Sequence, residues 1–147
     1  ENAYAKMVNC ARAAEMATGA KLEFKEPRSA LKAPIAVAPL TALMLSKMKT
    51  QGISEKDLKD KADFGSSDLG NVAHAYPTFN LTFKIAPTGT AGHSDAFREA
   101  AGTQEGWAAT VKAGKIVALA AYELLMNPAK VKEIQESFKE AKAREGK

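Results

Sequence analysis

The segment that decides the fold is DFGSSDLGNVAHAYPTFNLTFKI (63–85), followed closely by GTAGHSDAFREAAGT (89–103). It places an acidic loop rich in glycine and serine before two strand-like runs, and then carries a lone histidine on a second glycine-rich loop. A histidine between small residues just before a helix can point a ring nitrogen at a metal or a substrate without steric interference. One histidine is too few for a catalytic metal site, which usually takes about three protein ligands. The pattern therefore predicts either a site that is completed elsewhere or a structural histidine.

The same segment predicts a helix-rich α/β layer. Residues 72–76 form a short apolar run that ends at Pro77, and residues 79–85 alternate apolar and polar side chains as a strand does. Thr103 and the acidic residue after it predict the start of a long helix over 104–126. Because this helix is apolar around most of its circumference, we expect it to be buried on several sides and to cover both strands.

Shorter patterns predict the remaining elements. Residues 2–18 carry a helical apolar stripe ended by Gly19, and residues 21–25 alternate strictly, as in a strand with one wet face. Two further helices are predicted from apolar stripes, one ending at Gly52 and one beginning after Asn127. Their stripes are Leu40, Leu43, Met44 and Met48 in the first, and Val131, Ile134 and Phe138 in the second.

Composition limits the class of protein. A chain of 147 residues with 46% hydrophobic and 26% charged residues is a globular domain, not a disordered one. The net charge of +4 favours nucleic acid only weakly, because basic and acidic residues alternate, as in 55–61. Cys10 is the only cysteine, so we expect a buried, inert thiol and a reducing, cytoplasmic location. No apolar run approaches the roughly 20 residues of a membrane span. The start at Glu1 in helical sequence indicates a processed or truncated chain, or an omitted methionine or tag.

Each candidate site residue has an ordinary structural alternative. The loop 65–70 offers two hydroxyls and a carboxylate to a polar ligand, but Ser and Asp also cap ordinary turns. His93 is either a ligand or general base, or a hydrogen-bonded structural residue. His74 is expected to be a satisfied core histidine, and Trp107 a core residue. No serine stands on a Gly-x-Ser-x-Gly elbow, so no serine–histidine–acid triad is identifiable.

Four pieces together resemble the carboxyl-terminal part of a family of dinuclear metallohydrolases: residues 9–24, 66–72, 76–78 and 92–103. The family comprises aminoacylases, aminobenzoyl-glutamate hydrolases, auxin-conjugate amidohydrolases and related carboxypeptidases. The nearest likeness is to the aminobenzoyl-glutamate hydrolase branch. The last piece, which contains Gly-His-Ser followed by Glu-Ala-Ala, is fairly specific.

The resemblance implies a fold and a division of the chain. Residues 1–26 would be the last helix and strand of an α+β lid, or dimerisation, domain. Residues 27–147 would be the helix-rich carboxyl-terminal portion of a phosphorylase/hydrolase-like metallopeptidase catalytic domain. The parent enzyme would be a cytoplasmic homodimer that holds two divalent ions, zinc or manganese. It would cleave the amide bond of a small N-acyl amino acid, an aminobenzoyl-glutamate-like compound or a dipeptide, without nucleic-acid or membrane partners.

The resemblance also implies site roles. His93 would be the final ligand of the two-metal site. The substrate side of the cleft would be lined by Ser66, Ser67, Asp68, Gly70 and Gly92. The other metal ligands and the general-base glutamate belong to an amino-terminal half with no counterpart in this sequence, so no catalytic residue is assigned here. We therefore expect the chain alone to hold no metal stably and to lack amidase activity.

A rival hypothesis is an autonomous, non-enzymatic helical module that binds a protein or a nucleic acid. A steep loss of affinity with salt would favour nucleic acid. The fragment hypothesis instead expects an exposed apolar face where the missing half of the enzyme packs.

Overall fold

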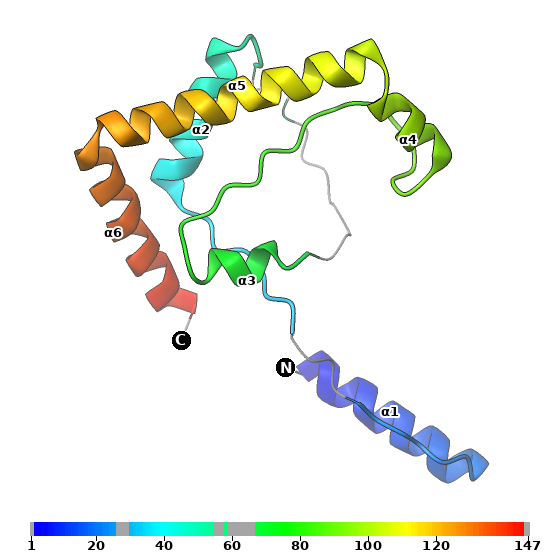
Figure 1. Ribbon diagram of the computed structural model, residues 1–147. Helices are drawn as coiled ribbons and strands as arrows, with labels where there is room; N and C mark the ends of the chain where they lie inside the picture. The colour runs from blue at the N-terminus through cyan, green and yellow to red at the C-terminus, as the bar shows by residue number, and fades with distance from the viewer. Residues whose placement is uncertain (1, 26–29, 55–57, 59–66, 146–147) are drawn as a thin grey trace. The chain divides into compact units, whose positions relative to one another are not determined.

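The computed structural model describes residues 2–25, 30–54, 58 and 67–145, shown as a ribbon in Figure 1. Its described residues form six helices and no β-strand. The chain divides into two compact units, Glu1–Ala30 and Leu31–Lys147. Neither unit is identified by this division as a lid or a catalytic domain, so the predicted domain assignment stays a prediction. In the described part, no helix is both long enough and apolar enough to cross a membrane.

The first unit consists of one helix and the segment that returns from it. Helix α1 covers Asn2–Thr18, as the sequence predicts, and Gly19 follows in the left-handed conformation with φ +70°. Beyond this turn Phe24 meets Tyr4 edge to face, with ring centroids 5.9 Å apart. The prediction of a strand at 21–25 is wrong, because the segment pairs with α1 instead of with a strand. The Leu22 N–H donates to the Glu15 side chain at 2.8 Å.

The second unit is built from five helices. They are α2 (Ala38–Thr50), α3 (Leu69–Ala73), α4 (Asp95–Ala101), α5 (Gln104–Met126) and α6 (Pro128–Glu145). Helix α2 contacts both α5 and α6, which also contact each other, while α4 contacts α5. Thr103 caps α5 by accepting a hydrogen bond from the Gly106 N–H at 3.1 Å, which confirms the predicted start of the long helix.

The core of the second unit lies where α2 and α6 meet one face of α5. All four residues of the predicted α2 stripe are buried, and Ile116 of α5 is only 1% exposed. Ile134 is the α6 residue buried in this cluster and Phe138 packs against it, which confirms two of the three residues predicted for this face. An ion pair between Lys47 and Glu123 joins α2 to α5 beside these contacts. Burial of apolar surface is thus concentrated on one side of α5.

The two central strands are not formed. Residues 72–76 complete α3 and the turn after it, where the Tyr76 N–H donates to the Val72 carbonyl at 2.9 Å. Residues 79–85 have no strand pairing, although Phe79 and Leu81 pack against the core while Asn80 is exposed. The alternating pattern therefore predicted the inward side chains in part, since Phe83, at an apolar position of the same run, is 44% exposed. A strand also needs a hydrogen-bonded neighbour, which this segment lacks in the described chain.

Three burial predictions are also wrong for the described chain. Helix α5 is buried on one face only, and Trp107 at its start is 59% exposed. Val111 and Leu125, which we expected to be covered, are 59% and 81% exposed. Cys10 is an exposed thiol and not a buried one. Each error has the same cause, because an apolar pattern records which faces can be buried and not what covers them.

We expect Ile116→Ala to destabilise the chain by about 2–5 kcal/mol, because it leaves a cavity among helices that cannot fully collapse. Urea unfolding followed by circular dichroism measures this loss. Val117→Ala is the matched control, since Val117 is the next residue of α5 and is 51% exposed. Equal losses for the two variants would contradict the position of the core.

Candidate functional site

His93 lies on the turn that leads into α4. Its backbone is left-handed, with φ 56°, a conformation that histidine adopts more readily than most residues other than glycine. Ser94 follows as the cap of α4 and accepts a hydrogen bond from the Phe97 N–H at 3.2 Å. The Ser94 hydroxyl also donates to the Ala91 carbonyl at 2.7 Å. These local bonds hold His93 at the beginning of the helix with its side chain exposed, and Gly92 beside it is exposed too.

The acidic residues that follow His93 form ion pairs with an arginine side chain. Asp95 lies 3.0 Å from the Arg98 guanidinium, and Glu99 lies 3.7 Å from the same group. No group of three His, Cys, Asp or Glu side chains suitable for a metal ion occurs among the described residues. A metal centre needs three or four such donors. The described residues therefore do not fit a complete metal site, and they offer His93 as a single exposed imidazole.

The predicted substrate loop is described from Ser67 onward, since Ser66 lies outside the described residues. The Ser67 hydroxyl accepts a hydrogen bond from the Leu69 N–H at 3.1 Å, which is a short turn closed by serine. Asp68 precedes α3, and its carbonyl accepts from the Asn71 N–H at 2.8 Å. Its carboxylate makes no cap hydrogen bond to the helix and is exposed. The turn is therefore an ordinary one that leaves one carboxylate at the surface.

Gly70 has a packing role that the sequence analysis missed. A Cβ at this position would lie 1.7 Å from the carbonyl oxygen of Lys32, so only glycine allows the two backbones to approach this closely. Asn71 fixes the same approach by accepting a hydrogen bond from the Lys32 N–H at 3.0 Å. The only sequence signal was a glycine next to an asparagine in a short apolar run. A substrate-binding role for Gly70 stays a prediction.

His74 belongs to this attachment of α3 and not to a strand. Its Nε2 atom lies 3.2 Å from the Ala33 carbonyl, and its own carbonyl accepts a hydrogen bond from Lys142 of α6 at 2.8 Å. The expectation of a satisfied histidine is met by these contacts, although the ring is only partly buried. Helix α3 is thus held between residues 32–33 and the end of α6.

The two predicted loops are not joined by any contact between their helices. Helices α3 and α4 do not contact each other in the described chain, and in Figure 1 the segment 77–92 runs between them. No hydrogen bond or ion pair links Asp68 to His93 in the part of the chain that the structure describes. Their predicted roles in one cleft therefore stay predictions.

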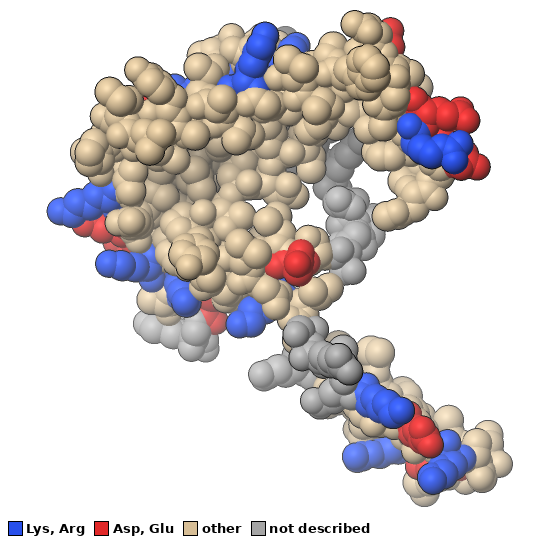
Figure 2. Space-filling view, in the orientation of Figure 1, with Lys and Arg blue, Asp and Glu red and all other residues tan. Residues whose placement is uncertain are grey.

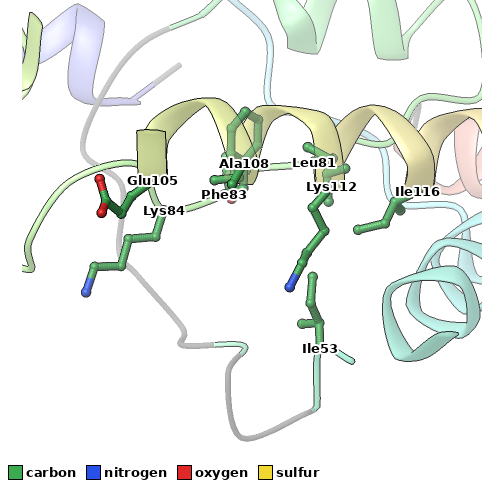
Figure 3. A pocket seen from close by; sticks show the side chains of 11 residues that line it. Ile53, Leu81, Phe83, Lys84, Glu105, Ala108, Lys112 and Ile116 are labelled. Carbon is green, nitrogen blue, oxygen red and sulfur yellow. The ribbon is translucent and has the colours of Figure 1, made fainter. Parts of the chain in front are cut away.

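A pocket of about 420 Å³ lies elsewhere, between α5, residues 81–84 and Ile53. Figure 3 shows Lys112 extending from α5 toward Ile53, while Lys84 and Glu105 lie together at the other end. Apart from these residues and Thr82 the walls are apolar, so the pocket suits an apolar group better than a polar substrate. Lys84 donates to Thr88 at 3.2 Å. None of the predicted site residues lines this pocket.

A shifted pKa is found at the beginning of α6. The hydrogen bond from Lys130 to the Glu133 carboxylate, 2.8 Å long, raises the pKa of Lys130, and the charge of Glu133 acts in the same direction. Both side chains sit on the surface of α6, and neither is among the predicted site residues. This pair stabilises a helix turn and offers no acid–base chemistry at the candidate site.

Comparison with known proteins finds distant, partial similarity to a peptidase. The chain is 28% identical over 136 residues to the Xaa-Arg dipeptidase of Homo sapiens and 27% identical over the same length to that of Mus musculus. The alignment covers 91% of this chain and 31% of each relative, so the chain spans about a third of their length. No family model matches the chain. The chain is therefore related to dipeptidases, which are hydrolases, over one part of their length.

We expect Gly70→Ala to destabilise the chain by about 1–3 kcal/mol or more, because the new methyl group meets the Lys32 backbone, which must move. Gly114→Ala is the matched control, since Gly114 lies mid-helix in α5 with nothing within 4 Å of an added Cβ. This control should gain about 1 kcal/mol from helix propensity. Urea unfolding of both variants measures the difference. A neutral Gly70→Ala would show that α3 does not pack closely on Lys32.

We expect His93→Ala to change the free energy of unfolding by no more than about 0.5 kcal/mol, since the ring is exposed. Calorimetric titration of the pure chain with zinc should show only weak binding, because one imidazole has no partner ligands among the described residues. Tight zinc binding that His93→Ala abolishes would refute this description of the site.

Proposed function

We propose that this chain is the carboxyl-terminal part of a metal-dependent amidohydrolase. The observation that carries the proposal is the alignment with the Xaa-Arg dipeptidases, which includes nearly all of this chain and less than a third of theirs. The parent enzyme cleaves the amide bond of a dipeptide or of a small N-acyl amino acid, including aminobenzoyl-glutamate-like compounds. The name of the relatives favours the dipeptide within this range.

In this proposal His93 is one ligand of a centre that holds two divalent ions, zinc or manganese. Its support is the exposed imidazole at the start of α4, held there by the Ser94 cap. The remaining ligands and the general base come from the part of the polypeptide that the alignment does not include. His93 is then one member of an incomplete ligand set and not a structural residue.

The second loop supplies the substrate side of the same cleft in this proposal. The exposed carboxylate of Asp68 and the hydroxyl of Ser67 are suited to hydrogen-bond donors on a peptide, such as an amino group. Gly92 leaves space beside His93. Because α3 and α4 do not contact each other, the rest of the enzyme must complete the cleft between the two loops.

The charges on the visible face of the molecule give a nucleic-acid-binding module no support. Figure 2 shows basic and acidic side chains close together at the margins of the visible face, and no continuous basic surface on it. Several of these charges pair with each other, as Lys132 does with Glu136 at 3.9 Å. Nucleic-acid binding depends on unpaired cations aligned with phosphates. The partners in our proposal are therefore the substrate, the rest of the polypeptide and a second subunit, in the cytoplasm.

The proposal is tested on the source gene and its product. We expect the reading frame to continue upstream and to encode a His-x-Asp motif and a Glu-Glu pair. The complete product should hydrolyse dipeptides with zinc or manganese, whereas the 147-residue chain should not. Replacing His93 by alanine in the complete product should lower kcat/KM by at least about 100-fold, a typical cost of losing a group that acts on the reacting centre. Lys139→Ala, an exposed change on α6, is the control.

Two results would contradict the proposal. The first is an initiation codon directly before residue 1 with no upstream coding sequence. The second is dipeptide turnover by the pure 147-residue chain that survives chelation of metals.

A further inference from the structure

Helix α5 has an apolar face on the side opposite the core. At 3.6 residues per turn, one set of positions falls on the face that points away from Ile116. We call this set the outer α5 stripe, and it consists of Trp107, Val111, Gly114, Ala118, Tyr122 and Leu125. All six residues are exposed. The stripe runs for about 27 Å along the helix, at a rise of 1.5 Å per residue.

The outer α5 stripe differs from the solvent face of an ordinary surface helix. Such a face is polar or charged, whereas the stripe contains no charged residue. The charged residues of α5 lie at other positions, namely Glu105, Lys112, Lys115 and Glu123. Figure 2 shows the surface along α5 as largely uncharged. A helix that is apolar on both sides is typical of a layer with protein above and below it.

The size and shape of the stripe fit a close contact. Trp107 and Tyr122 are 59% and 65% exposed. At roughly 150–250 Å² for each aromatic side chain, these two alone present on the order of 250 Å². Between these two aromatic residues the stripe protrudes little from the helix, because Gly114 has no side chain and Ala118 only a methyl group. Gly114 lowers helix stability by about 1 kcal/mol relative to alanine. In this chain a Cβ at position 114 would meet open space, so no contact within the chain requires the glycine.

Exposed apolar residues also occur beyond α5, and their distribution bears on which partner covers the outer α5 stripe. Helix α4 has no buried residue, and its Phe97 is 38% exposed. Val72 of α3 and Tyr76, in the turn after it, are 46% and 70% exposed. A pair of identical chains joined through one self-complementary patch would leave such dispersed residues uncovered. The part of each relative that the alignment leaves uncovered, about two thirds of its length, is long enough to cover all of these residues.

We propose that the outer α5 stripe packs against the part of the parent polypeptide that this chain lacks, on an uncharged, apolar surface of that part. The inference rests on the proposed function, since about two thirds of each relative's length lies outside the alignment. Helix α5 then lies between two layers of the enzyme. Its Thr103 end adjoins α4 and His93, so the same contact positions the candidate metal ligand.

Cysteine labelling tests the contact directly. In a Cys10→Ala background, Val111→Cys is introduced on the stripe and Lys139→Cys on the exposed face of α6 as the control. A maleimide is applied to the 147-residue chain and to the complete product, and peptide mass spectrometry follows each site. We expect position 111 to react at least tenfold more slowly than position 139 in the complete product. In the 147-residue chain the two rates should be similar.

A second variant probes the close approach at Gly114. Gly114→Leu should leave the melting temperature of the 147-residue chain unchanged or higher, because the site is open. In the complete product it should lower the melting temperature by about 5 °C or more, or prevent recovery of folded protein, because a bulky residue overpacks a close contact. Lys139→Leu should have no such effect in either protein.

The outcomes separate this inference from the proposed function. Equal labelling of positions 111 and 139 in an active complete product would overturn the inference alone. Protection of position 111 that disappears when the complete product is diluted to monomers would show a second copy on the stripe, and would also overturn it. Absence of any upstream coding sequence overturns both proposals.

Discussion

The contact between α2 and the inner face of α5 supports the rest of the second unit. Ile116 stands at its centre, almost completely buried, with the α2 stripe on one side and Ile134 of α6 on the other. The Lys47–Glu123 ion pair lies at its edge. Because burial of apolar side chains is the largest favourable term in folding, the orientation of α5 follows from this cluster. The position of α4, and hence of His93, follows in turn from α5.

The candidate site residues are positioned mainly by local interactions. Ser94 and Thr103 cap their helices through bonds that span three residues, and Ser67 closes a turn that spans two. Such bonds define the conformation of each loop without bringing the loops together. Among the described residues, distant parts of the chain are linked near the candidate residues by Gly70 and Asn71, which meet Lys32, and by His74, which contacts Ala33 and Lys142. In our proposal, the assembly of a cleft therefore depends on contacts with the rest of the parent polypeptide.

A helix that is apolar on two opposite faces explains why burial was predicted incorrectly for α5. Ile116 and Val117 are adjacent and both aliphatic, yet one is 1% exposed and the other 51%. The free energy gained on burial depends on the area removed from water. The sequence gives the chemical type of a surface, but it does not say which element packs against that surface. In our proposal, the exposed face of α5 lacks its neighbour because that neighbour belongs to the part of the polypeptide that the alignment with the dipeptidases does not include.

The sequence by itself determined the longer helices, their caps and the buried stripe of α2, because these follow from interactions within a few residues. The bounds of α1 and α5, the buried stripe of α2 and the Asn127-Pro128 start of α6 are of this kind. The tertiary structure alone decided that 72–76 completes a helix and that 79–85 packs on the core without a partner strand. It also decided that Gly70 must be glycine, because the Lys32 carbonyl occupies the space of a Cβ. These outcomes depend on contacts between residues far apart in the chain, which no local pattern encodes.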